Sequence, residues 1–134
     1  MKLIFILIFI LSSMSFSKKQ LSDFKWENRL IVTFDIPSEG LDSLAPSDLK
    51  DRKLLLFAFE SENLIYSNFE GEIDQIDFLK LSKKYPGFYF LIGLDGGVKS
   101  YGKKENFSIG ELIKQIDSMP MRQSEIRRKG NGNS

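Results

Sequence analysis

Four short apolar runs along the chain predict β-strands. They lie at residues 30–34, 53–59, 88–92 and 98–101 and are rich in Leu, Ile, Val, Phe and Tyr. Runs of this length, bounded by polar and turn residues, are typical of strands, and the first two are apolar enough to be buried. Asp95-Gly96-Gly97 separates the last two, and an Asp-Gly pair predicts a β-hairpin with a type I′ turn, in which both central residues have positive φ.

Two longer segments have the period of amphipathic helices. The first spans residues 73–84, and Pro86-Gly87 ends it. Its apolar positions are Ile73, Ile76, Phe78, Leu79, Leu81 and Tyr85. The second begins at Ser108, which is predicted to form a capping box with Glu111, and ends near Ser118. Its buried face comprises Ile109, Leu112, Ile113 and Ile116.

The remaining connections predict the overall fold. Residues 47–50 suffice for only one or two helical turns, and the polar segment 60–72 is predicted to be a loop with an extended stretch at 64–66. The order is therefore strand, weak helix, strand, helix, two strands and helix. This order predicts an α/β fold of the thioredoxin-like type, with a four-stranded mixed sheet and two to three helices.

The first residues predict export. Lys2 precedes an unbroken apolar run at residues 3–11, and Ser15-Phe16-Ser17 lies where a signal peptidase would cut. The run is too short for a membrane-spanning anchor, which is the alternative. We therefore expect a signal peptide at 1–17, a thioredoxin-like domain at 18–125 and a flexible basic tail at 126–134. The mature protein would be secreted or periplasmic, and would meet the membrane only transiently through its leader.

Composition removes several kinds of chemistry. The chain has no cysteine and no histidine, so it has no CxxC motif and thiol–disulfide exchange is excluded. The commonest general base and metal ligand is also missing. The chain carries 19 basic and 18 acidic residues, and the charges balance once Lys2 is removed with the leader. This balance gives no reason to expect nucleic acid as a partner, and no metal or cofactor is expected.

Three stretches together resemble a known family. They are Phe-Lys-Trp-Glu-Asn-Arg-Leu at 24–30, Leu-Ile-Gly-Leu-Asp-Gly-Gly-Val-Lys at 91–99 and Ile-Asp-Ser-Met-Pro-Met-Arg-Gln-Ser-Glu at 116–125. The chain is similar to the domain of unknown function 4174 family of small exported bacterial proteins. The same domain occurs in extracellular animal proteins, including sushi-repeat-containing proteins and a coiled-coil-domain matrix protein. The resemblance implies a thioredoxin-like fold and an extracytoplasmic setting, but no activity or catalytic residues.

Two features depart from the pattern that the resemblance implies. The connection between the first two strands is shorter than the helix-bearing segment usual in the family, so the first helix is expected to be short or lost. A thioredoxin has its cysteine pair just after the first strand, where this chain has Asp35 to Glu39. Pro86 lies near the place of the thioredoxin cis-proline but about two residues too far from the hairpin to align with it.

Trp26 and Arg29 are the first candidate binding residues. They flank the start of the first strand, and an exposed Trp beside Arg is typical of binding hot spots. The alternative is that Trp26 fills the end of the core and Arg29 pairs with a carboxylate such as Asp117.

Lys99 is a third candidate, because with Asp95-Gly96-Gly97 it could form a turn whose backbone N–H groups hold a phosphate. The alternative is a hairpin turn without a ligand. Arg122 is the fourth candidate, in the segment Met119-Pro120-Met121-Arg122. This segment would fold back toward Trp26 and expose Arg122 on a contact surface. The alternative is that the methionines cover the core and Arg122 pairs with Glu125.

The leading functional prediction is a non-redox binding module of the cell envelope, whose partner is an envelope or extracellular protein or polymer. Charge reversal at Arg122 would then weaken binding and leave the melting temperature nearly unchanged. The alternative is a small carboxylate-dependent hydrolase or transferase. It would use Asp35 and Glu39, which follow the first strand where open α/β sheets usually bind ligands.

Overall fold

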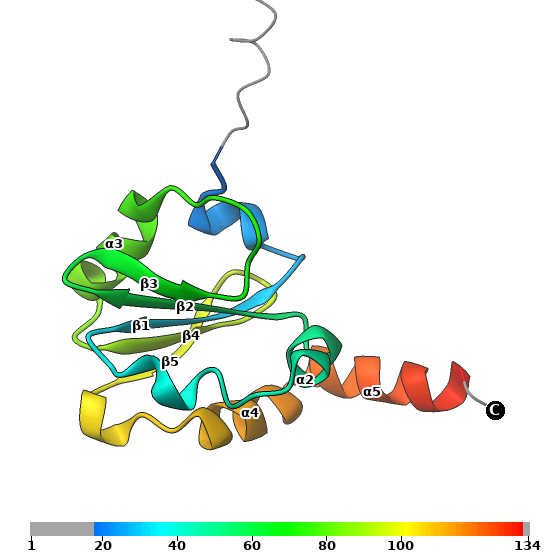
Figure 1. The fold of residues 1–134 in the computed structure, drawn as a ribbon. Helices are drawn as coiled ribbons and strands as arrows, with labels where there is room; N and C mark the ends of the chain where they lie inside the picture. Colours follow the sequence, from blue (N-terminus) through cyan, green and yellow to red (C-terminus); the bar gives the residue numbers. More distant parts are fainter. Residues whose placement is uncertain (1–17, 133–134) are drawn as a thin grey trace, which may run out of the picture.

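Strand β1 (Arg29–Phe34) lies at the centre of a five-stranded mixed sheet (Figure 1). The computed structural model describes residues 18–132, so the predicted signal peptide and the last two residues of the predicted tail lie outside the described residues. β1 pairs in parallel with β2 (Leu54–Glu60) and antiparallel with β4 (Tyr89–Ile92). β3 (Asn63–Ser67) and β5 (Val98–Gly102) are the edges, and the sheet order is β3-β2-β1-β4-β5.

The strands β2-β1-β4-β5, with β4 and β1 antiparallel, form the predicted thioredoxin-like arrangement. The sheet has a fifth strand where four were predicted, because part of the polar segment 60–72 pairs antiparallel with β2 as β3. Ser61 and Glu62 join the two strands, and both have positive φ, 48° and 66°. Two positive φ values in a two-residue hairpin loop are typical of a type I′ turn. Neither residue is Gly, Asn or Asp, so the usual sequence signal for this turn is missing.

Helices cover both faces of the sheet (Figure 1). α3 (Gln75–Lys84) and the 3-10 turn Leu21–Phe24 lie on one face, and α2 (Pro46–Asp51) and α4 (Ile109–Asp117) lie on the other. Alternate side chains of β1 enter the two cores, with Leu30 on the α3 side and Ile31 on the α2 and α4 side. The six residues of α2 are the short first helix that the short connection predicts.

α3 begins two residues later than predicted, and its buried face is narrower than the period predicts. Asp74 caps the helix by accepting a hydrogen bond from the N–H of Ile76, and Ile73 pairs with Lys19 outside the helix. Phe78 and Leu81 are the buried residues of α3. Ile76, which the period places on the apolar face, is 62% exposed.

The hairpin between β4 and β5 is confirmed, but the type I′ turn predicted there is wrong. Gly96 is the one residue of the turn with positive φ, at 83°, and its N–H donates to the Gly93 carbonyl at 3.0 Å. The strand register shifts between Leu91 and Ile92. A single left-handed glycine with a register shift is typical of a longer hairpin loop that ends in a bulge.

The chain after β5 is helical almost throughout. It passes through the 3-10 turn Lys104–Asn106 to α4, where the Ser108 hydroxyl accepts the predicted N-cap hydrogen bond from Glu111 N–H at 3.3 Å. α5 (Pro120–Gly132) then runs through residues 126–132, for which the composition predicts a flexible tail. No helix between residues 18 and 132 is long and apolar enough to cross a membrane. The same residues contain no cis peptide bond, so Pro86 does not reproduce the thioredoxin cis-proline.

Candidate functional site

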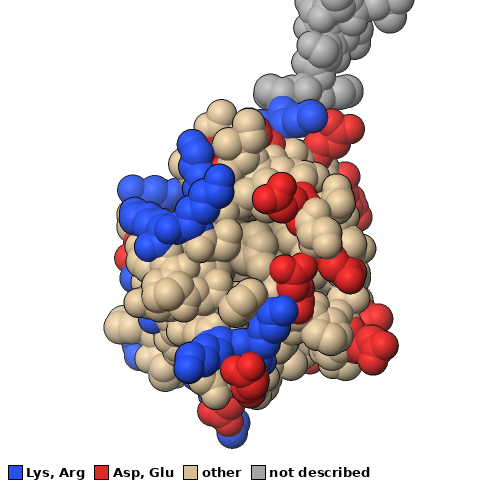
Figure 2. Space-filling view, turned by 90° about the vertical axis from the view of Figure 1, so that its left-hand side faces the viewer, with Lys and Arg blue, Asp and Glu red and all other residues tan. Residues whose placement is uncertain are grey.

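An open groove of about 1040 Å³ lies at the carboxyl ends of β1 and β2 (Figure 2). Its walls come from the end of β1, the β2–β3 turn, α3 and the segments that flank β4 and β5. In Figure 2, basic side chains gather at the left and below, acidic side chains lie at the right, and uncharged residues line the hollow between them. The carboxyl ends of parallel strands are where α/β sheets usually bind ligands.

Apolar side chains line the groove at two depths. Phe34 and Phe59 are buried, and their rings stack with centroids 5.3 Å apart. Ile76 and Phe88 also line the groove but are exposed, Phe88 to 41%. The Lys104 ammonium lies 4.7 Å from the centroid of the Phe88 ring, so this ring already carries a cation on its face. The groove therefore offers both apolar contact area and charge.

Most charged groups of the groove have no ion-pair partner. The basic residues in its lining are Lys80, Lys83, Lys103 and Lys104, and the acidic ones are Asp35, Glu62 and Glu105. Within residues 18–132, only Lys80 of this set has a partner of opposite charge within 4.0 Å, namely Asp77 at 3.7 Å on the same helix. The other side chains remain available to a ligand.

Three residues at the carboxyl ends of the strands have left-handed backbone conformations. Asp35 has φ of 55°, and Ser61 and Glu62 form the β2–β3 turn that also lines the groove. The Asp35 carboxylate accepts a hydrogen bond from Ser61 N–H at 3.0 Å, while Asp35 N–H donates to Phe59 O at 2.8 Å. Left-handed conformations cost non-glycine residues about 1 kcal/mol or more each, so this edge of the groove is held under strain.

The structure separates the two carboxylates of the predicted enzyme. Asp35 lines the groove, whereas Glu39 lies exposed in the 3-10 turn Ser38–Gly40 and is not part of the lining. Glu62 and Glu105, which the sequence patterns do not single out, are the acidic residues that share the groove with Asp35. Residues 18–132 contain no group of three or more acidic side chains arranged to hold a metal ion.

The four predicted binding residues lie at the opposite end of β1, and they differ in exposure. Trp26 is 59% exposed, so the alternative that it fills the core is wrong. Its backbone has φ of 68°, and its N–H donates to Leu94 O at 2.6 Å. Lys99 is exposed as well. Arg29 and Arg122 are 1% and 4% exposed, so the prediction that Arg122 lies on a contact surface is wrong.

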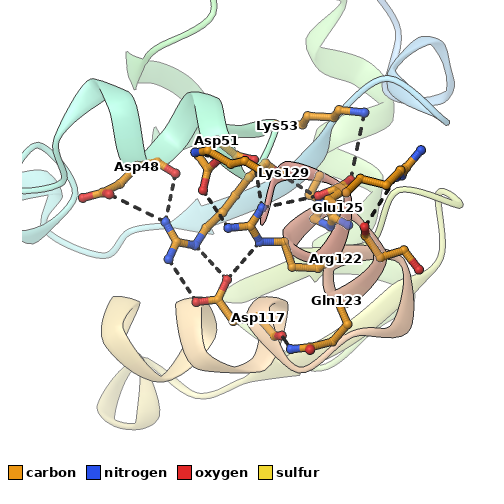
Figure 3. A network of polar contacts seen from close by, with 12 residues as sticks. Asp48, Asp51, Lys53, Asp117, Arg122, Gln123, Glu125 and Lys129 are labelled. Atoms are coloured by element: carbon orange, nitrogen blue, oxygen red, sulfur yellow. Dashed lines mark hydrogen bonds and ion pairs between the residues drawn. The ribbon is translucent and has the colours of Figure 1, made fainter. Parts of the chain in front are cut away.

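Arg122 is instead the centre of an ion-pair network that holds α5 against the domain (Figure 3). Its guanidinium pairs with Asp51 at 2.8 Å, Asp117 at 3.1 Å and Glu125 at 3.5 Å. Glu125 also pairs with Arg29 at 3.2 Å. The alternative that Arg122 pairs with Glu125 is therefore confirmed. The alternative that Arg29 pairs with a carboxylate is confirmed as well, although the partner is Glu125 and not Asp117.

The network also shifts the titration of its carboxylates. Hydrogen bonds from Lys129 and Arg122 lower the pKa of Asp51 from 3.8 to about 2. The Arg52 guanidinium, which donates to both oxygens of Asp117 at 3.0 and 2.9 Å, lowers the pKa of that carboxyl group. Both carboxylates therefore stay ionised in moderately acidic solution.

The β4–β5 turn uses its own carboxylate in place of an external anion. The Asp95 carboxylate accepts hydrogen bonds from Lys99 at 2.8 Å and from Gly97 N–H at 2.9 Å, and these contacts lower its pKa. The donors that would hold a phosphate are thus occupied, and the alternative of a hairpin turn without a ligand agrees with the structure.

Residues 20–125 match the family model described as Domain of unknown function (DUF4174). The chain belongs to this family. No curated protein and no solved structure matches the chain significantly. The DUF4174 match covers the whole sheet and its helices and ends within α5, at Glu125 of the ion-pair network.

Sequence reasoning missed the groove residues of this DUF4174 domain for specific reasons. Ile76 was assigned to the buried face of its helix, and Glu62 was assigned to a featureless loop. Lys103 and Lys104 belong to no motif, and only their position on the rim draws attention to them. The one available signal was Asp35, which directly follows the first strand.

Proposed function

We propose that this protein is an exported, non-redox thioredoxin-like domain of the cell envelope that binds a segment of another protein in the groove at the carboxyl ends of β1 and β2. The observation that carries the proposal is that exposed apolar side chains and unpaired charges line one groove. Export rests on the pattern of the first 17 residues. The absence of cysteine excludes the exchange chemistry of redox-active thioredoxins.

The lining of the groove suggests the kind of segment that fits. An apolar side chain would contact Ile76 and Phe88, which would otherwise remain exposed to water. Flanking carboxylates of the segment would pair with Lys83 on α3 and with Lys103, which follows β5, because neither lysine has an ion-pair partner among the described residues. A polymer without apolar groups would leave the Ile76 and Phe88 surface unused, so a protein segment fits better.

Selection of displayed heptapeptides on the chain from Lys18 onward tests the proposal. We expect enriched peptides to combine an apolar residue with neighbouring Asp or Glu. The double variant Lys83→Glu, Lys103→Glu should weaken their binding about tenfold or more, because it replaces two attractions with two repulsions. Its free energy of unfolding should change by no more than about 0.5 kcal/mol, since these lysines are exposed.

A matched pair of variants controls for general loss of apolar surface. Ile76→Gln should weaken peptide binding several-fold, whereas Ile65→Gln, at an isoleucine on β3 that is 47% exposed and outside the groove lining, should not. Failure to enrich acidic-apolar peptides, or equal binding by both variants, would overturn the proposal. The carboxylate-dependent enzyme stays a prediction, and an activity that survives Asp35→Asn would dispose of it.

A further inference from the structure

A second pocket lies at the other end of the sheet, away from the groove. Its volume is about 310 Å³, and this open pocket is lined by Arg29, the β4–β5 turn, Lys99 and the start of α5. Leu94, Met119 and Met121 supply its apolar wall. The size is at the lower end of the range for small-molecule sites.

The guanidinium of Arg29 in this pocket is only partly paired. Nη1 donates to Arg52 O at 2.9 Å and to the Glu125 carboxylate at 3.2 and 3.3 Å. Nε and Nη2 are buried and have no hydrogen-bond partner among the described residues. Buried polar groups are rarely left without partners, and arginine does not lose its proton, so two charged donors here lack an acceptor.

The positions of the two unpaired nitrogens indicate which kind of acceptor would fit them. Nε and Nη2 lie on the same edge of the guanidinium, and their two N–H bonds are parallel, as in bidentate pairs with the oxygens of a carboxylate. The charge of Arg29 is already partly neutralised by Glu125, and the charges of Asp95 and Lys99 in the lining neutralise each other, so the pocket matches a monoanion better than a dianion such as phosphate. A single negative charge shared by two oxygens satisfies both conditions.

We propose that this pocket binds a carboxylate carried on a short apolar body. The carboxylate accepts hydrogen bonds from Nε and Nη2 of Arg29, and the apolar body packs against Leu94, Met119 and Met121. Water does not reach the two nitrogens in the present arrangement. Methionine side chains are unbranched and adaptable, so Met119 and Met121 are the part of the wall that re-packs to admit the ligand.

Two kinds of ligand carry this chemistry, and two probes distinguish them. Hexanoate represents a free short-chain acid, and N-acetyl-leucine represents the end of a polypeptide chain. Hexanamide and N-acetyl-leucinamide are their neutral counterparts. We expect at least one acid to bind about tenfold or more tightly than its amide, because only the acid forms charge-assisted hydrogen bonds. The tighter acid identifies the source.

Nuclear magnetic resonance of the isotope-labelled chain from Lys18 onward is the measurement. The side-chain Nε–H signal of Arg29 should shift on addition of the acid, together with the backbone signals of Gly93 and Leu94. Arg29 itself is not replaced, since it belongs to the ion-pair network. Met121→Asp, at a side chain that is 41% exposed, should weaken binding about tenfold by charge repulsion and loss of apolar contact. Ile126→Asp places the same charge on α5 at a side chain that is also 41% exposed but lies outside the pocket lining, and it should change binding less than about twofold.

The results that support the carboxylate site differ from those that would overturn it. A shift of the Arg29 Nε–H signal by an acid and not by its amide, weakened by Met121→Asp alone, supports the site. Equal shifts with acid and amide, an unmoved Arg29 signal, or equal effects of Met121→Asp and Ile126→Asp would overturn it. None of these results depends on peptide binding in the groove, so the two proposals fail independently.

Discussion

At the amino end of β1, the guanidinium groups of Arg29 and Arg122 are buried and paired with carboxylates, whereas at its carboxyl end most of the groove lysines have no partner within the described residues. Arg122 alone contacts three carboxylates. The two ends show that charged residues of one small domain divide into a group that holds the fold and a group that remains available to a ligand.

The chemistry of the two cations explains the division. The planar guanidinium has five donors and is weakly hydrated, so it can join several carboxylates at once in a buried position. The ammonium of lysine is strongly hydrated and is costly to bury. The buried cations of the network are therefore arginines, whereas lysines take part in it only from exposed positions, as Lys129 does at Asp51, and otherwise lie on the solvent-facing rim of the groove.

The sharpest way to break this comparison is to remove the centre of the network. Arg122→Ala should lower the free energy of unfolding by about 3 kcal/mol, because three partly buried carboxylates would lose their shared partner. Chemical denaturation measures the change. Arg128→Ala, on an exposed part of the same helix, should cost no more than about 0.5 kcal/mol.

This result would reverse the expectation from the sequence that Arg122 affects binding and not the melting temperature. If Arg122→Ala and Arg128→Ala changed the free energy of unfolding equally, the network would not hold α5, and the comparison between the two ends would fail.

A smaller effect depends on pH. The folded-state pKa of Asp51 is about 2, below its ordinary 3.8, so its ionised form stabilises the fold. This contribution is complete above about pH 4 and is lost as the pH falls from about 4 to about 2. Because the Asp51 side chain is 33% exposed, we expect Asp51→Asn to cost only about 1 kcal/mol at neutral pH.

Denaturation of the native chain and of Asp51→Asn between pH 2 and 7 measures the difference. The two free energies of unfolding should converge toward pH 2. Asp42→Asn, at an exposed aspartate with no ion pair within the described residues, is the control and should show no such convergence. A constant difference between the native chain and Asp51→Asn at all pH values would contradict the pairing.

The smallest expected effect concerns the strained edge of the groove. Glu62→Gly should raise the free energy of unfolding by about 0.5 kcal/mol, because glycine adopts a φ of 66° without steric cost. Glu62→Ala keeps the strain and should change the free energy by less than about 0.3 kcal/mol. Thermal denaturation of both variants checks this, and a destabilising Glu62→Gly would show that the Glu62 side chain itself holds the turn.

Local patterns predicted most of the fold. The four apolar runs became β1, β2, β4 and β5, and the Ser108 cap marked the start of α4. β3 was missed because the Ser61-Glu62 turn lacks the residues that favour positive φ. The Asp95-Gly96 pair correctly predicted a hairpin between β4 and β5, but the loop is longer than the two-residue turn that this pair indicates.

The candidate site was harder to predict because its determinants are far apart in the sequence. Arg122 and Asp51 are 71 positions apart, so nothing near Arg122 shows that it is buried. Likewise, Ile76 lies on the apolar side of its helix by period, but α3 buries Phe78 and Leu81 and leaves Ile76 exposed in the groove lining. The sequence identifies charged and apolar residues, but packing between distant segments decides which of them are free.

The burial of β1 has a consequence for experiment. All six of its residues are buried, and β2 and β4 pair with it on either side. Backbone amides in such a strand exchange with deuterium only when the whole domain opens, whereas those of edge strands and helix ends exchange through local fluctuations. Deuterium uptake at β1 therefore reports the cooperative unfolding of the whole domain. Uptake at α5 and at the β2–β3 turn reports the local opening of the two ends of the sheet, which requires less free energy.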